Sequence, residues 1–269
     1  MAVGGAPSPC WAFRDREDGG MAPWPAITGA GLAIGTLYGI FGVGGSSFAT
    51  PVLGLLGVPG LVAIAAPLPA TIPAAIVGAT AYARRKEVEW QLARWSIAGG
   101  VPGTIVGALL SRLVGGGPLL LASGVVLGII GLRILVPIPG TERVRGHARR
   151  RRGFVVGVAA VIGVFTGLLA NGGGFLLVPL YVVVLGLTMP ESAGTSLVVI
   201  AVLAVPTLAS HLLLGHIRWS VAAPFALGAV PGALAGTVVT RRVRSDSLRQ
   251  AFGCLLIVFA VYFVAHQLG

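Results

Sequence analysis

Two glycine-rich runs that interrupt long apolar stretches are the residues best suited to bind a ligand. They read GIFGVGGSSFATP at 39–51 and GLLANGGGFLLVP at 167–179. Each glycine costs a helix about 1 kcal/mol relative to alanine, so three close together predict a helix break in each run. A half-helix that restarts after the break, near Ser46 or Gly174, presents free N–H groups and the positive end of its dipole. The two runs therefore favour binding of an anion.

The composition places these breaks inside a membrane. Of the 269 residues, 55% are hydrophobic and 10% are charged, whereas a soluble domain carries about a quarter charged residues. The mean hydropathy is +0.93. These values exclude a soluble globular enzyme and indicate an all-α polytopic membrane protein. Non-helical backbone at membrane depth survives only where protein or water satisfies its polar groups, so each break marks a polar site. The alternative is that these glycines only allow helices to cross closely.

Cutting the chain at its charges and its Gly/Pro clusters predicts eight apolar segments. A spanning helix needs about 20 apolar residues. The two interrupted segments cover 26–57 and 153–187. The six uninterrupted segments cover 61–83, 90–112, 118–137, 192–215, 219–240 and 248–267. Residues 1–25 mix acidic and basic side chains before any apolar run, and we expect them to form a disordered tail.

The chain also repeats itself at a nearly constant offset. The set Ile34, Gly35, Gly39, Gly44, Gly45 and Pro51 recurs 128 residues later, and the set Trp90, Gly99, Pro102, Gly103, Gly107 and Arg112 recurs 129 residues later. We therefore predict two four-segment repeats, 26–137 and 153–269, joined by a basic cytoplasmic connector at 138–152. Each repeat begins with a glycine-broken helix. The glycine stripes could pack within one chain or between two chains, which leaves a homodimer possible.

The basic residues test how the interrupted segments cross the membrane. The chain has 19 basic and 8 acidic residues, and basic residues collect in cytoplasmic loops. If each interrupted segment crosses once, 13 basic residues lie on one side and 5 on the other. If each enters and returns as a re-entrant hairpin, the repeats are inverted and the division is 14 against 4. The charges favour the inverted arrangement, with the connectors near 84–94, 143–152 and 241–249 on one face. Nucleic-acid binding, the other explanation of a net charge of +11, is the minor hypothesis.

Polar side chains inside the predicted spans are few. All eight acidic residues fall in tails or near span ends, so no carboxylate is expected at mid-membrane to relay protons or hold a cation. The sequence shows no catalytic constellation, nucleotide-binding loop or metal-spaced cluster, and we expect neither an enzyme nor a cofactor. We interpret Tyr82 and His211, at matching repeat positions, as interfacial anchors. Backbone N–H groups and hydroxyls remain to hold an anion.

The paired Gly-rich break followed by a proline, in each half of an eight-segment chain, resembles the TauE/SafE family of sulfite exporters, also called the toluene-sulfonate uptake permease family. The likeness covers 28–267, and the second motif with Asn171 and the later Gly194, Thr195 and Ser196 is the better match. The first half has Ala65, Ala66 and Pro67 at the equivalent positions. The resemblance implies a multi-pass carrier of the bacterial inner (plasma) membrane for sulfite or related sulfur-containing anions.

We therefore predict a secondary transporter that exports a small sulfur oxyanion through a mid-membrane site between the two broken helices. The candidate substrate-binding residues are Gly44, Gly45, Ser46, Ser47, Asn171, Gly172, Gly173, Gly174, Thr195 and Ser196. Two alternatives stay open: an uptake permease for an organosulfonate or thiosulfate, and a membrane scaffold without transport.

Overall fold

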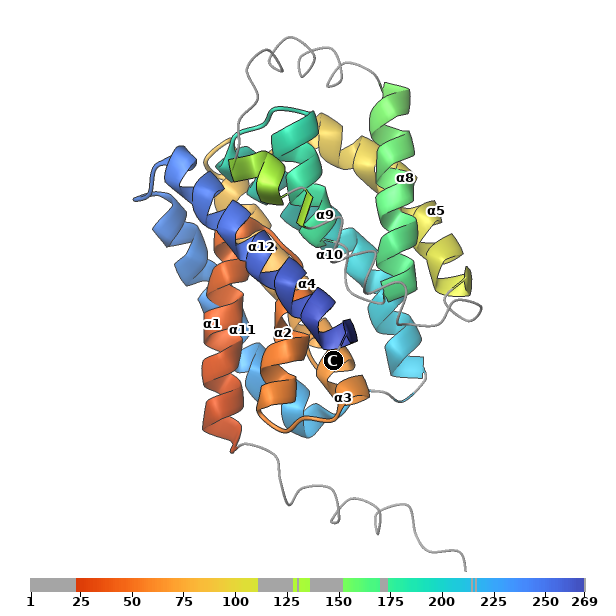
Figure 1. Cartoon of the computed structure of the whole chain (residues 1–269), viewed down its shortest axis with the longest axis vertical. Helices are drawn as coiled ribbons and strands as arrows, with labels where there is room; N and C mark the ends of the chain where they lie inside the picture. The colour runs from red at the N-terminus through yellow and green to blue at the C-terminus, as the bar shows by residue number, and fades with distance from the viewer. Residues whose placement is uncertain are drawn as a thin grey trace, which may run out of the picture.

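The computed structural model describes residues 23–110, 128–129, 131–135, 152–169, 174–213, 215 and 217–268, and every regular element in these ranges is a helix (Figure 1). The first half contains α1 (Trp24–Phe41), α2 (Gly45–Leu55), α3 (Gly60–Ala65), α4 (Leu68–Ala83) and α5 (Trp90–Leu110). The second half contains α8 (Arg152–Leu169), α9 (Gly174–Pro179), the π-helix η2 (Leu180–Val184), α10 (Met189–Leu213), α11 (Trp219–Thr240) and α12 (Ser245–Leu268). The all-α prediction is confirmed. Most of the predicted tail and of the basic connector 138–152 lies outside the described residues.

The predicted segments match the helices closely. The span predicted at 61–83 is divided into α3 and α4 by a turn at Ala66 and Pro67. The spans predicted from 90, 192, 219 and 248 correspond to α5, α10, α11 and α12. Of the span predicted at 118–137, only 128–129 and 131–135 are described, and both pieces are helical.

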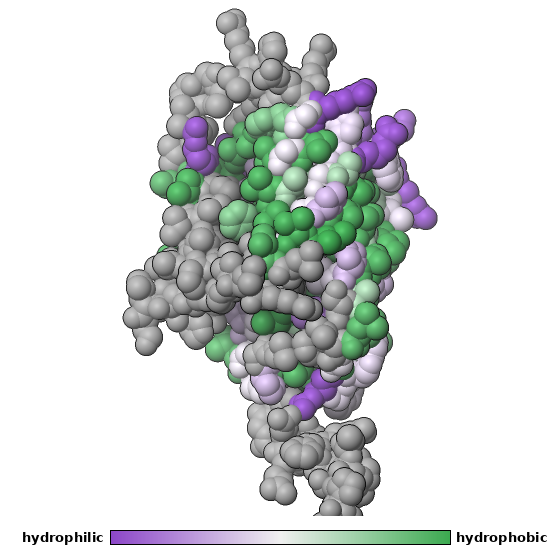
Figure 2. Space-filling model, turned by 90° about the vertical axis from the view of Figure 1, so that its right-hand side faces the viewer, coloured by the Kyte–Doolittle hydropathy of each residue, from purple (hydrophilic) through white to green (hydrophobic). Residues whose placement is uncertain are grey.

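The surface of the described part suits a lipid environment. Within the described residues, four helical stretches are long and apolar enough to cross a membrane: Trp24–Phe41, Val62–Ala83 (most of α3 together with α4), Met189–Leu213 and Trp219–Thr240. Large apolar side chains face outward, such as Leu227, which is 72% exposed, and Val258, which is 63% exposed. Figure 2 shows an apolar middle with hydrophilic residues toward the two ends. Water would penalise so much exposed apolar surface, so the chain is a multi-pass membrane protein.

Glycine stripes join helices of the two halves in parallel pairs. A Cβ on Gly31, Gly35 or Gly39 of α1 would meet the backbone of Phe225, Ala229 or Ala233 of α11, in that order. Glycines 228, 232 and 236 of α11 lie in the same way against the backbone of α1. Because the residue numbers rise together, α1 and α11 run parallel and touch backbone to backbone. Small residues permit this approach, and packing rather than water drives helix association in a membrane.

A second pair of helices joined by a glycine stripe is α5 and α8. A Cβ on Gly99, Gly103 or Gly107 of α5 would overlap the carbonyl oxygens of Val156, Ala160 and Val164 of α8. The first helix of each predicted repeat therefore packs on the third segment of the other repeat. The glycine stripes that could have joined two copies are thus occupied within one chain.

The described ends of the three basic connectors lie together at one end of the bundle, in the upper part of Figure 1. Arg85, after α4, donates from Nη2 to the Thr237 carbonyl near the end of α11 at 2.7 Å. At the start of α8, the Arg152 guanidinium lies 5.5 Å from the ring centroid of Trp95, which is near the start of α5. This placement agrees with the re-entrant arrangement, whereas single crossings would separate the connector at 241–244 from the other two.

Candidate functional site

The first glycine run breaks the helix where its sequence predicts. The helix α1 ends at Phe41, and Gly42 has φ +66°, a left-handed conformation that glycine adopts without penalty. The Gly42 N–H closes the helix by bonding to the Tyr38 carbonyl at 2.8 Å. The helix α2 then restarts at Gly45, and no side chain caps its N-terminus. The N-cap, Gly44, has no side chain that could cap the first N–H groups, and these groups have no partner within the helix itself.

The second run is described only from Gly174 onward. The helix α8 is described to Leu169 and α9 from Gly174, and residues 170–173 between them lie outside the described residues. Pro179 ends α9, and the next turn is the π-helix η2, in which the Leu185 N–H bonds to the Leu180 carbonyl at 3.1 Å. Proline lacks the N–H that would continue the α-helical pattern. The π-helical turn begins directly after this proline.

Gly194, Thr195 and Ser196 of α10, here called the GTS motif, lie directly against the first break. The Ser196 hydroxyl is buried and lies 2.8 Å from the Gly42 carbonyl and 2.9 Å from the Ala193 carbonyl, so it can donate to either. A Cβ on Gly42 would lie 2.5 Å from the Ala193 Cα and from the Ser196 Oγ. The second half of the chain thus contacts the broken backbone of the first half.

A connector, residues 84–89, lies over the same region. The Glu89 N–H donates to the Thr195 hydroxyl at 3.0 Å. A Cβ on Gly194 would lie 2.7 Å from the Glu87 carbonyl oxygen. Gly194 and Thr195 of α10 therefore contact the connector, and Ser196, the next residue of α10, contacts the first break.

Tyr82 holds the end of α1 from the other side. It is fully buried, and its hydroxyl lies 2.8 Å from the Gly39 carbonyl, 3.3 Å from the Ile40 carbonyl and 3.2 Å from the Thr240 hydroxyl. The interpretation of Tyr82 as an interfacial anchor was therefore wrong. Carbonyls at a helix end need external donors, and Tyr82 supplies one. His211, the other predicted anchor, is partly buried.

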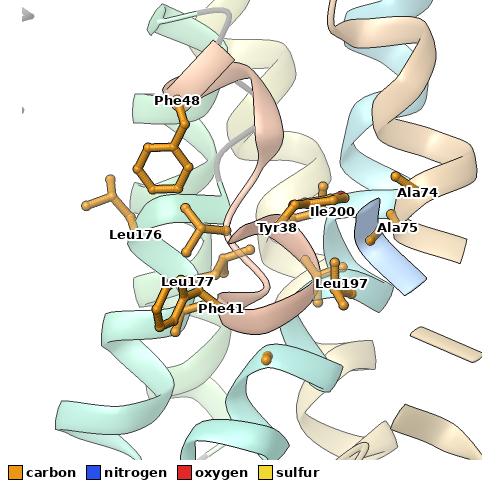
Figure 3. Close-up of a cluster of buried hydrophobic side chains, with 14 of the residues drawn as sticks. Tyr38, Phe41, Phe48, Ala74, Ala75, Leu176, Leu177, Leu197 and Ile200 are labelled. Carbon is orange, nitrogen blue, oxygen red and sulfur yellow. The ribbon is translucent and has the colours of Figure 1, made fainter. Parts of the chain in front are cut away.

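The residues on either side of the first break meet α9 through apolar side chains. Figure 3 shows Phe41 and Phe48, which flank the first break, beside Leu176 and Leu177 of α9. The helix α12 packs on the same region: the rings of Phe48 and Phe259 lie 4.4 Å apart between centroids, and those of Phe41 and Phe252 lie 5.3 Å apart. Apolar side chains therefore fill the space beside the breaks.

A small pocket lies beside α1, between α4 and α11. Its polar lining comes from Tyr38 and Thr71, its other lining residues are apolar, and it has room for roughly one water molecule. The Tyr38 hydroxyl lies 3.4 Å from the Thr71 carbonyl. An oxyanion with several oxygens does not fit there, so the described conformation is closed in this region.

The predicted site residues are described to different extents. Gly44 precedes α2 and is buried, Gly45 begins α2, Gly174 begins α9, and Thr195 and Ser196 are buried in α10. For Ser46 and Ser47 only the helical backbone is described. Asn171, Gly172 and Gly173 lie outside the described residues. Within the described part, no group of three or more His, Cys, Asp or Glu side chains could hold a metal ion.

Buried tyrosines were not among the candidate site residues, although they contact the region of the breaks. Tyr181 of η2 is fully buried, and its hydroxyl lies 2.8 Å from the Ser96 hydroxyl of α5. The chain has only four tyrosines. A tyrosine inside so apolar a sequence was the signal that could have indicated these contacts, because a buried tyrosine hydroxyl needs a hydrogen-bond partner.

Comparison with known proteins assigns residues 27–263 to one protein family. The family model described as "Sulfite exporter TauE/SafE" matches residues 27–263. A "Probable membrane transporter protein" of Xylella fastidiosa (strain Temecula1 / ATCC 700964) is 28% identical over 88% of this chain and 93% of its own length. The "Probable membrane transporter protein YunE" of Bacillus subtilis (strain 168) is 24% identical over 85% of this chain and 92% of its own length. No solved structure matches the chain significantly.

Proposed function

Since the chain belongs to the TauE/SafE sulfite exporter family and is a membrane transporter, we propose that it is a secondary carrier that exports sulfite or a related small sulfur oxyanion. Family membership favours a carrier over the scaffold alternative. The observation that carries the proposal is the uncapped N-terminus of α2, which begins inside the protein directly after the break at Gly42–Gly44. Backbone N–H groups at such a terminus suit an anion.

The proposed site lies between the two breaks and uses the glycines, hydroxyls and amide predicted from the sequence. Buried Phe41, Phe48, Leu176 and Leu177 line the approach, so the substrate enters only after these side chains separate. Weak binding by backbone groups and hydroxyls suits a carrier, because an exporter must also release its substrate. The inverted repeat arrangement, which the shared end of the basic connectors supports, gives the two breaks opposite approaches to this site.

Transport of labelled sulfite into proteoliposomes tests the proposal, with Gly42→Ala and Gly215→Ala as a matched pair. Both glycines have positive φ, +66° and +68°, so both variants carry the same kind of backbone strain. Only at position 42 does the new Cβ also meet α10; at 215 it meets nothing within 4 Å. We expect Gly42→Ala to abolish sulfite flux and Gly215→Ala to retain it.

Two results would count against the proposal. Wild-type protein that moves no sulfite, but moves an organosulfonate or thiosulfate in a counterflow panel, would favour the uptake alternative. Equal sulfite flux in both variants would show that the first break is not part of the transport site.

A further inference from the structure

The connector 84–89 closes the first break on the side of the basic residues. Its Glu89 N–H binds the Thr195 hydroxyl at 3.0 Å, and its Glu87 carbonyl lies against Gly194. The neighbouring Ser196 contacts the Gly42 carbonyl. Any movement of the connector away from α10 therefore disturbs the residues that hold the break.

Glu87 within this connector carries a carboxylate oxygen that accepts no hydrogen bond. Its Oε2 atom is buried and makes no hydrogen bond, although the side chain as a whole is 32% exposed. The nearest basic group is Arg85, whose Nη1 lies 3.9 Å from Oε2. At 3.9 Å this Nη1 lies beyond hydrogen-bond distance of Oε2, and the other terminal nitrogen, Nη2, donates to the Thr237 carbonyl at 2.7 Å. A charged carboxylate oxygen left in this state is unfavourable.

The surrounding charged and titratable groups do not remove this penalty. Burial raises the pKa of Glu87 above its usual value, Arg85 lowers it, and the Glu191 carboxylate of α10 raises it further. Glu191 is held in place as part of a capping box, in which its Oε2 accepts the Thr188 N–H at 2.9 Å. Tyr82 of α4 also lies within electrostatic reach of Glu87. The net direction is a raised pKa of Glu87, so the carboxylate binds a proton more readily while the connector is closed than when it is hydrated.

We propose that Glu87 is a proton-binding site, which is occupied when the connector 84–89 is closed over the first break and empties when the connector opens. The proton comes from water on the connector side and forms an O–H bond at Oε2, and it returns to water when the connector lifts and hydrates the carboxylate. This proposal rests on the proposed function, because it makes the proton the coupling ion of the carrier.

Hydrogen–deuterium exchange of the purified protein in lipid nanodiscs tests the site without requiring transport. The measured quantity is the protection of the peptide that covers 84–89, corrected for the intrinsic pH dependence of exchange. The sign follows from linkage: a group whose pKa is raised in the closed state stabilises that state at low pH, and this stabilisation is lost as the pH rises. Wild type should therefore lose protection as the pH rises.

Three variants sharpen this test. In Glu87→Gln, which resembles the protonated form, protection should not change with pH. In Glu191→Gln, which keeps an amide oxygen for the capping box, the loss of protection should be smaller and should be complete at lower pH, because the closed-state pKa of Glu87 is raised less. Asp246→Asn removes an exposed carboxylate at the start of α12, and it should behave like wild type. If Glu87→Gln does not fold, the shift in Glu191→Gln still decides the question. Protection that is independent of pH in wild type, or the same loss in Glu87→Gln, would overturn the proposal.

A transport measurement separates this proposal from the proposed function. Proteoliposomes with an entrapped pH indicator report proton movement that accompanies a sulfite gradient. Wild type should move protons with sulfite, and Glu87→Gln should lose this proton movement. An absence of sulfite flux in wild type would refute the proposed function, whereas sulfite flux with the same proton movement in Glu87→Gln would refute only the role of Glu87.

Discussion

The parallel pair α1 and α11 gives a prediction that follows directly from backbone geometry. Gly35 and Gly29 both lie in α1, but they face different surroundings. A Cβ at Gly35 would overlap the Ala229 carbonyl oxygen and lie 2.7 Å from the Ala229 Cα, whereas a Cβ at Gly29 would meet nothing within 4 Å. The matched variants Gly35→Ala and Gly29→Ala therefore add the same methyl group with and without a backbone clash.

The magnitude can be worked from these distances. Ordinary contacts between carbon atoms lie at about 3.5–4.0 Å, so Gly35→Ala must push the two helices apart by about 1 Å at their closest point. Overpacking of this kind costs about 1–3 kcal/mol. In Gly29→Ala the new methyl group overlaps nothing, and alanine is a better helix former than glycine by about 1 kcal/mol. We expect Gly35→Ala to lower the unfolding temperature by several degrees and Gly29→Ala to leave it unchanged or raise it slightly.

Thermal unfolding of the detergent-solubilised variants, followed by size-exclusion chromatography of the heated samples, measures the difference. The comparison needs no substrate, so it tests the fold independently of the transport proposal. If Gly35→Ala and Gly29→Ala unfold at the same temperature, the backbone contact between α1 and α11 is not as described.

Three further substitutions test contacts around the first break and the start of α10. Ser196→Ala should cost about 1–3 kcal/mol of stability and reduce sulfite flux, because it removes the buried donor to the Gly42 carbonyl at 2.8 Å; unchanged flux in proteoliposomes would contradict a role in holding the break. Tyr82→Phe should destabilise by a similar amount of about 1–3 kcal/mol, since it removes the hydroxyl that reaches the end of α1, and an unchanged unfolding temperature would refute that role. Thr188→Ala removes the N-cap side chain of α10 and should cost about 1 kcal/mol while sulfite flux is retained; lost flux in correctly folded protein would show a wider role.

Helix limits and helix breaks could be predicted well from the sequence. The predicted restart point near Ser46 agrees with the observed start of α2 at Gly45. These features depend on local properties: glycine weakens a helix wherever it stands, and the length of an apolar run determines whether it can span a bilayer. The anion hypothesis followed from the same local reasoning.

Side-chain roles near the candidate site were less predictable. Tyr82 looked like an interfacial residue because it is the last aromatic residue before the basic connector, yet it is buried against the end of α1. Its partners Gly39 and Thr240 are 43 and 158 residues away in sequence. No pattern within one segment indicates which distant carbonyl a hydroxyl will reach.

The all-α membrane fold and the break in the first glycine run were predictable from the amino-acid sequence, because apolar length and the backbone cost of glycine act segment by segment. The helix pairs were visible only in the folded chain, where α1 packs on α11 and α5 packs on α8. The same holds for the contact of Ser196 with the Gly42 carbonyl and for the connector that lies over the first break. Glycine stripes permit close packing, but they do not determine which helix packs against them. The partner is set by the contacts that all the helices make together.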